Sequence, residues 1–266
     1  NPPQILNTVE RPRLFRLLEE NEDRGNILVV GQAAQGKSTL TASFLRTGKV
    51  PVLWISLTSR ENNYLKLYEK LLQGLCSLKQ GNASAGQWQV PRNTLGAGED
   101  RIRHYEALSA LFGDLKERIC IVFDDLQVLD ETLSGFELIQ YLTESRYDNL
   151  LMFLLSRNMP GFDFARLRMN RQLFVLENDN LAFTRDETRE FFKQTAEELR
   201  IDPERIYEIT GGWAGGLTLI SESIRQLKDM DRLPARLSAD LFSFFSQEIY
   251  DRLDPSVRQF LMTASV

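Results

Sequence analysis

The chain has 266 residues, of which 42% are hydrophobic and 26% are charged, as in ordinary soluble globular proteins. A net charge of −5 argues against a chain-wide attraction to nucleic acid or to an anionic membrane, and leaves only a local basic patch. The two cysteines lack C-x-x-C spacing, and no apolar run approaches the roughly 18 residues that a membrane span needs. We therefore expect a cytoplasmic protein with reduced thiols, no membrane contact, and no direct nucleic acid contact by this chain.

Short apolar runs alternate with amphipathic segments over the first two thirds of the chain. The amphipathic segments at 64–75 and 105–115 repeat apolar residues at helical spacing. Nearly all-apolar runs suit strands that are buried on both faces of a parallel sheet, and such runs occur at 26–30, 52–57, 119–123, 150–155 and 172–176. The alternation predicts an α/β fold with a mainly parallel five-stranded sheet, interrupted at 80–100 by an aperiodic surface insertion.

After about residue 180 the predicted strands end and only helices follow. Thr184 and Glu187 have the spacing of a capping box, in which each side chain binds the backbone of the other. Asp202-Pro203 predicts the start of the next helix and Gly211-Gly212 its end. Further helices are predicted by apolar spacing at 217–227 and 241–253, and after Asp254-Pro255. The chain begins without Met and stops inside an apolar pattern, so we expect a fragment of a longer protein.

The stretch "GQAAQGKSTL" follows the first predicted strand directly and has the phosphate-loop spacing G-x-x-x-x-G-K-[ST]. In such a loop, glycines let the backbone turn so that successive N–H groups point at phosphate oxygens. Lys37 would neutralise the β- and γ-phosphates, and Ser38 would donate its hydroxyl oxygen to Mg²⁺. The predicted nucleotide-binding residues here are Gly31, Gln32, Ala33, Ala34, Gln35, Gly36, Lys37, Ser38 and Thr39.

The stretch "ICIVFDDLQ" places two carboxylates after a buried strand, at the sheet edge where open α/β sheets bind ligands. Asp124 would hold Mg²⁺, and Asp125 could orient or deprotonate the attacking water, so that Asp125 and Lys37 are the catalytic candidates. The alternative is a strand that merely ends in an acidic turn. His104, the only histidine, precedes a predicted helix and is predicted to be a surface residue rather than a base.

A third strand, in "LLMFLLSRNMP", ends at Ser156-Arg157. An arginine at this point would approach the γ-phosphate and distinguish a triphosphate from a diphosphate through one charge-assisted contact. The alternative is a solvated arginine that simply follows a strand.

The order of these motifs resembles the STAND class of signal-transducing P-loop NTPases, in particular the MalT type of large ATP-binding transcriptional regulators. "VERPRLFRLL" is similar to the segment that precedes the phosphate loop in that family and packs on the adenine, which implies nucleotide contacts for Val9 and Arg11. "VLWISL", "FDDLQ" and "LLSRNMP" resemble its second strand, its Mg²⁺ strand and its sensor strand. "LAFTRDETREFF" and "ITGGWAGGLTLI" resemble its helical-domain signatures, and the resemblance implies a nucleotide contact for Trp213.

The resemblance also implies a domain organisation and a switch. It implies a nucleotide-binding domain at 1–180, a helical lid domain at 181–235 and the start of a winged-helix domain at 236–266. ADP would hold a closed monomer, and ATP with an inducer, acting through a sensor elsewhere in the protein, would open it and let it self-associate. One departure is visible, because Trp213-Ala214-Gly215-Gly216 stands where the family has Trp-Pro-Ala-Gly, whose proline touches the base.

Two other classes of function share the phosphate loop. An AAA-type ATPase machine with continuous turnover would also use Asp124, but it would usually have Glu at position 125 and an arginine from a neighbouring subunit. A small-molecule kinase would need an acceptor-binding signature, and none accompanies the loop. The sequence therefore favours a slow regulatory ATPase that uses ATP, ADP and Mg²⁺ as a signal.

Overall fold

The computed structural model describes residues 2–3, 9–48, 50–81, 99–113, 115–199 and 202–226. The chain divides into two compact units. The first unit comprises Asn1–Gln32 and Lys37–Leu181, and the second comprises Ala33–Gly36 and Ala182–Val266. The helices expected at 241–253 and after Asp254-Pro255, and most of the insertion expected at 80–100, lie outside the described residues.

The first unit is built on one five-stranded sheet, in which every paired strand is parallel. The strand order is β2-β3-β4-β1-β5. The predicted α/β fold is thereby confirmed, and the strands are β1 (Asn26–Val30), β2 (Val52–Ser56), β3 (Ile119–Asp124), β4 (Leu150–Ser156) and β5 (Phe174–Leu176). Side chains along β3 and β4 are buried throughout, which explains why these strands read as continuous apolar runs rather than alternating ones.

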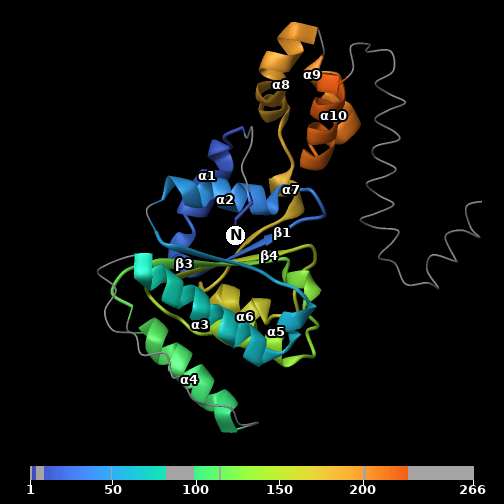
Figure 1. Cartoon of the computed structure of the whole chain (residues 1–266). Coiled ribbons are helices and arrows are strands. Elements are labelled where there is room, and N and C mark those ends of the chain that lie inside the picture. Colours follow the sequence, from blue (N-terminus) through green and yellow to red (C-terminus); the bar gives the residue numbers. More distant parts are fainter. Residues whose placement is uncertain are drawn as a thin grey trace, which may run out of the picture. The chain divides into compact units, whose positions relative to one another are not determined.

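Helices cover both faces of this sheet (Figure 1). On one face α1 (Pro12–Glu19) and α2 (Lys37–Thr47) pack over alternate strand residues such as Ile27 and Val29. On the other face, Leu28 packs with residues of four helices: α3 (Tyr64–Gly81), α4 (Glu99–Gly113), α5 (Ser134–Glu144) and α6 (Phe164–Met169). The short segments of this unit are η1 (Glu22–Arg24), η2 (Ser59–Asn62), η3 (Leu126–Val128) and α7 (Asn178–Leu181).

The prediction that His104 lies at the surface is wrong. His104 lies inside α4, is 3% exposed, and stacks its ring on Tyr68 of α3 with 4.3 Å between the ring centroids. Residues 104, 108 and 112 share one helical face, and Leu108 and Phe112 on that face belong to the buried core. His104 is therefore enclosed because its helix packs through this face, and nothing places it near the strand ends that carry the predicted site.

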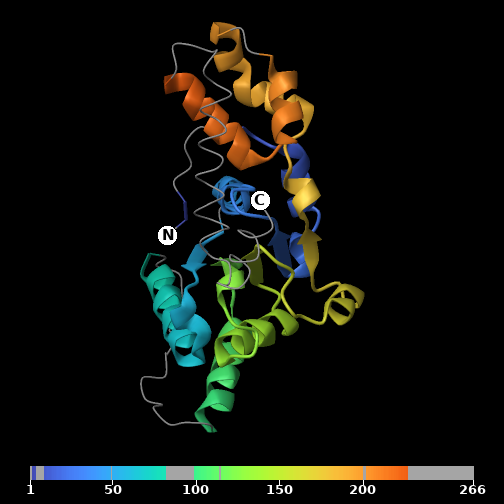
Figure 2. The ribbon, with the colours of Figure 1, turned by 90° about the vertical axis from the view of Figure 1, so that its right-hand side faces the viewer.

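The second unit is helical where it is described. Its helices are α8 (Arg185–Leu199), α9 (Pro203–Thr210) and α10 (Ala214–Gln226), which lie side by side (Figure 2) around a core that includes Phe192, Ile206 and Leu217. Among the described residues of both units, no helix is long and apolar enough to cross a membrane.

The predicted start of α8 and the predicted start and end of α9 are confirmed. The N–H of Glu187 donates to Thr184 Oγ1 at 3.2 Å, and the N–H of Thr184 donates to Glu187 Oε2 at 2.9 Å, which completes the capping box. Asp202 caps α9 by accepting the N–H of Glu204 at 3.0 Å. Gly211 ends that helix in the left-handed region, with φ of 58°.

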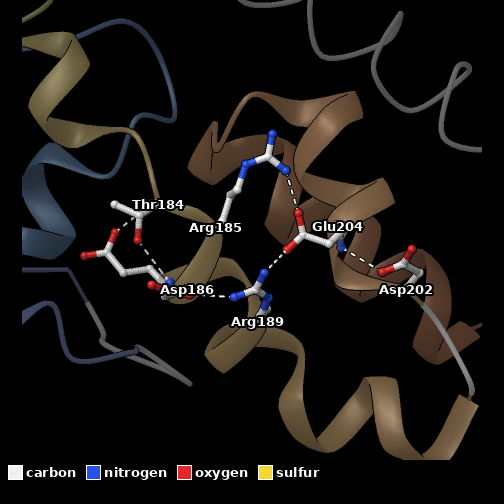
Figure 3. Close-up of polar contacts among 7 residues, drawn as sticks. Thr184, Arg185, Asp186, Arg189, Asp202 and Glu204 are labelled. Carbon is white, nitrogen blue, oxygen red and sulfur yellow. Dashed lines mark hydrogen bonds and ion pairs between the residues drawn. The ribbon is translucent and has the colours of Figure 1, made fainter.

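One carboxylate joins α8 to α9. Arg185 and Arg189, one helical turn apart on α8, both donate to Glu204 of α9 (Figure 3). Arg189 also donates to Asp186, and the Arg185 guanidinium lies 4.6 Å from the ring centre of Tyr207. Because these groups face water, we attribute to them the alignment of the two helices rather than a large share of the stability.

Two adjacent glycines give a direct test of the packing in this unit. Both have positive φ, but a Cβ on Gly212 would lie 2.1 Å from the backbone oxygen of Phe183, whereas a Cβ on Gly211 would meet nothing within 4 Å. We expect Gly211→Ala to cost about 1–2 kcal/mol, the usual penalty of the left-handed region. Gly212→Ala should cost about 3 kcal/mol or more, because it also breaks the bond from the Phe183 N–H to the Gly212 oxygen.

Urea denaturation of the two variants, followed by circular dichroism, measures the difference. Gly211→Ala is the matched control, since it carries the same residue change and a similar backbone conformation. Equal losses of stability would show that the close approach of Phe183 to Gly212 does not matter.

Candidate functional site

The loop between β1 and α2 has the backbone that its glycines predict. Ala34 and Gly36 have φ of 55° and 86°, in the positive range that tight turns require. Gly31 fixes the start of the loop, because its N–H donates to the oxygen of Ser156 at the end of β4 at 3.1 Å. Helix α2 begins at Lys37, so Ser38 and Thr39 lie in its first turn. A loop of this shape before a helix N-terminus is suited to an anion.

Lys37 lies inside the loop and is only 9% exposed. Its ammonium donates to the backbone oxygens of Gly31 and Gln32, the two residues that open the loop. The pKa of Lys37 is lowered to about 8, first by burial and then by the positive charge of Arg157, while Asp124 and Asp125 oppose the shift. A negatively charged ligand in the loop would relieve the repulsion between Lys37 and Arg157.

Ser38 and Asp124 bring two oxygen atoms together. The hydroxyl of Ser38 donates to Asp124 Oδ1 at 3.0 Å, from the first turn of α2 to the end of β3. Asp124 is 8% exposed, and burial raises the pKa of its carboxyl against the effect of this hydrogen bond. A divalent cation would offset that burial cost, and a hydroxyl with a carboxylate is the kind of oxygen donor set that Mg²⁺ takes. The residues present therefore fit the predicted metal position.

Asp125 is held in an unusual conformation by its neighbours. Its φ and ψ are 63° and 42°, in the left-handed region that residues with a side chain seldom adopt. Its N–H donates to Asp124 Oδ1 at 3.0 Å, and its Oδ1 accepts the side-chain amide of Gln127 at 2.8 Å. The oxygen of the same amide accepts the backbone N–H of Arg157 at 2.9 Å. Sequence reasoning missed Gln127, although it stands in the quoted stretch "FDDLQ".

The segment before the phosphate loop is anchored to α7. Arg11 is buried and donates to the oxygen of Leu181 at 2.8 Å, and Arg13 donates to the oxygen of Asn180 at 2.9 Å. At the other end of this short helix, Asn178 Oδ1 accepts the N–H of Gln32 at 3.3 Å. Helix α7 therefore links the predicted nucleotide-contacting segment to the phosphate loop. The sequence did not predict this helix, because "NDNL" is short and mostly polar. Val9 is half-buried just before this anchor.

Trp213 and part of the loop belong to the second unit. Within that unit the indole N–H of Trp213 donates to the oxygen of Ala33 at 3.1 Å. A Cβ on Gly215 would lie 2.7 Å from the Cβ of Ala34, so the start of α10 approaches these loop residues closely.

A family model described as the AAA ATPase domain matches residues 9–153. The chain belongs to this family. The matched residues contain the phosphate loop and Asp124-Asp125, and they end inside β4, before Arg157.

Individual relatives are consistent with this assignment. The transcriptional regulator MalT of Klebsiella pneumoniae is 26% identical over 279 residues, which cover 100% of this chain and 30% of that regulator. A STAND protein with a tetratricopeptide repeat sensor from Pyrococcus horikoshii has a similar structure, with a TM-score of 0.59, 17% identity, and coverage of 98% of this chain and 40% of its own. The Orc1 protein of Aeropyrum pernix, solved in complex with DNA, gives a TM-score of 0.56 with 19% identity and covers 98% of this chain and 72% of its own.

The resemblance to MalT-type STAND P-loop NTPases that the motifs predict is confirmed by the family model and the MalT relative. The two structural relatives establish the fold alone. The chain spans less than a third of the length of the MalT regulators that it matches.

The lowered pKa of Lys37 predicts proton uptake on ADP binding. In the free protein a growing share of Lys37 is neutral above a pH of about 8. Bound phosphates favour the ammonium, so affinity for ADP should fall by up to about tenfold per pH unit above that value. Calorimetry in two buffers of different ionisation enthalpy should show greater proton uptake near pH 8.5 than near pH 7. Equal uptake at both pH values would contradict the assignment.

Proposed function

We propose that this chain is the nucleotide-operated module of a signalling switch. It would bind ATP or ADP with Mg²⁺, hydrolyse ATP slowly, remain a closed monomer with ADP, and self-associate with ATP to drive an output such as transcription activation. The observation that carries the proposal is the buried Lys37 bonded inside the phosphate loop, beside the paired oxygens of Ser38 and Asp124. The resemblance to MalT regulators along the whole chain supports a signalling role over a metabolic one.

The proposed roles follow from position. The backbone N–H groups of residues 31–36, with Lys37 and the first turn of α2, would bind the phosphates. Ser38 and Asp124 would hold Mg²⁺. Arg157 would contact the γ-phosphate, which only ATP carries, because its charge already acts on Lys37.

The switch requires two arrangements of the chain. A γ-phosphate biases two arrangements only through contacts that it makes in one of them. We propose that the nucleotide-binding domain (1–180) supplies those contacts, and that the helical lid domain (181–235) and the start of a winged-helix domain (236–266) respond. Val9, Arg11 and Trp213 would contact the base and ribose in the closed form, so that ADP leaves slowly.

The alternative is an AAA-type machine with continuous turnover. It is favoured by membership of the AAA ATPase domain family and by the fold similarity to Orc1. The switch and the machine differ in their rate of ATP hydrolysis, since a machine needs fast cycling and a switch needs long-lived nucleotide states. They also differ in assembly, because a machine would form a ring on ATP alone.

We expect the isolated chain to purify as a monomer holding ADP, with turnover far below about one per second, the low end for enzymes. Identification of the bound nucleotide, light scattering and a steady-state ATPase assay measure the three properties, and DNA should not raise the rate. Lys37→Ala is the control, because it should purify without nucleotide while keeping its circular dichroism spectrum. Fast multiple-turnover hydrolysis, or a ring formed on ATP alone, would favour the machine.

Asp125→Asn should separate hydrolysis from binding. The change keeps the size of the side chain but removes the carboxylate that would orient or deprotonate the attacking water. We expect an ATP affinity within about twofold of the parent and a single-turnover rate lower by about a hundredfold. An unchanged hydrolysis rate in this variant would show that Asp125 has no role in hydrolysis. The assignment of the nucleotide-binding residues would not be affected.

A further inference from the structure

The side chain of Gln127 joins two elements of the site that the sequence separates by 30 residues. Its amide nitrogen donates to Asp125 Oδ1 at 2.8 Å, and its amide oxygen accepts the backbone N–H of Arg157 at 2.9 Å. A carboxylate can only accept and a backbone N–H can only donate, so the two partners fix which end of the amide faces which. Few side chains as long as glutamine carry both a hydrogen-bond donor and an acceptor, so few residues could make both contacts from position 127.

Asp125 and Arg157, the two residues that Gln127 contacts, both depend on their surroundings to hold their positions. Asp125 is in the left-handed region, a strained conformation for a residue with a side chain, which persists only where the surroundings hold it. Arg157 follows the last residue of β4, so its side-chain position depends on how the backbone leaves that strand. The hydrogen bonds of Gln127 constrain the carboxylate of one and the backbone of the other.

A continuous chain of hydrogen bonds results. Ser38 donates to Asp124 Oδ1, the N–H of Asp125 donates to the same oxygen, and Gln127 then connects Asp125 to Arg157. The chain runs from the first turn of α2, across the end of β3, to the end of β4. Every link lies in the first unit and uses only described residues.

We infer that Gln127 is a positioning residue for ATP hydrolysis, an inference that rests on the proposed function. By occupying Oδ1 of Asp125, the amide leaves Oδ2 of the same carboxylate for the attacking water. By holding the backbone of Arg157, it sets the distance between that carboxylate and the side chain that contacts the γ-phosphate. Gln127 therefore places the water-orienting group relative to the phosphate that the water attacks, without touching either itself.

Gln127→Glu is the most discriminating variant. The two side chains have nearly the same shape, and a glutamate oxygen still accepts the Arg157 N–H, but it cannot donate to Asp125 and repels its carboxylate. We expect the single-turnover rate of ATP hydrolysis to fall by about ten- to a hundredfold, the usual effect of a misplaced reacting group, while the affinities for ATP and ADP stay within about twofold. Gln127→Met, which removes both polar ends, should lower the rate similarly.

The matched control is Gln140→Glu. Gln140 also donates its amide to a carboxylate, Glu144 Oε1 at 2.9 Å, but both residues lie within α5 and not at a strand end. This variant should hydrolyse ATP at the parental rate. Thermal unfolding of all variants shows whether a lost rate accompanies a lost fold.

A double-mutant cycle with Asp125→Asn tests whether Gln127 acts through Asp125. If it does, adding Gln127→Glu to Asp125→Asn should change the rate by less than about twofold, because the carboxylate that Gln127 positions is already gone. Equal rate losses in both backgrounds, a parental rate in Gln127→Glu, or a loss of nucleotide affinity instead of rate would each overturn the inference. Failure of the proposed function would look different, since the parental chain itself would then bind no nucleotide, hydrolyse ATP fast or form a ring on ATP alone.

Discussion

The site is organised by the cost of burying the charge of Lys37. An ammonium that is 9% exposed loses most of its hydration, and the nearby Arg157 makes its protonation still less favourable. Two backbone oxygens of the loop and two carboxylates partly compensate. A polyanionic ligand would complete the compensation, so the loop, the carboxylates and Arg157 belong to one electrostatic arrangement whose energy changes when a phosphate group arrives or leaves.

The parallel sheet is what brings these charges together. All strands of a parallel sheet point the same way, so the residues that follow them meet at one edge. In the order β2-β3-β4-β1-β5, the strands that end in Asp124, in Ser156-Arg157 and at the phosphate loop are direct neighbours. Their interior is apolar and buried on both faces, and, apart from Asn26 at the start of β1, their polar groups gather where each strand ends.

Much of this arrangement could be predicted from the sequence, because each part has a local signal. An apolar run marks a buried strand, a glycine-rich loop before a helix marks the phosphate position, and the capping residues mark the helix ends in the second unit. The features that the sequence did not predict correctly depend on contacts between segments that are distant along the chain. His104 was misplaced because the partner that buries it, Tyr68 on α3, is remote in sequence. Gln127 and α7 were overlooked because their importance lies in hydrogen bonds to backbone groups far along the chain.

Under the proposed function, the position of Asp125 favours a slow reaction. A carboxylate orients water best when it reaches the water and has an oxygen available for it. Asp125 is one methylene shorter than the glutamate usual in AAA-type machines, so its carboxylate reaches less far toward the water even when Gln127 orients it. The oxygen that would serve the water therefore stands on a short side chain whose backbone is held in a strained conformation. Such a group would hydrolyse ATP rarely, and a long-lived ATP state is what a signalling switch requires and what a continuously cycling machine must avoid.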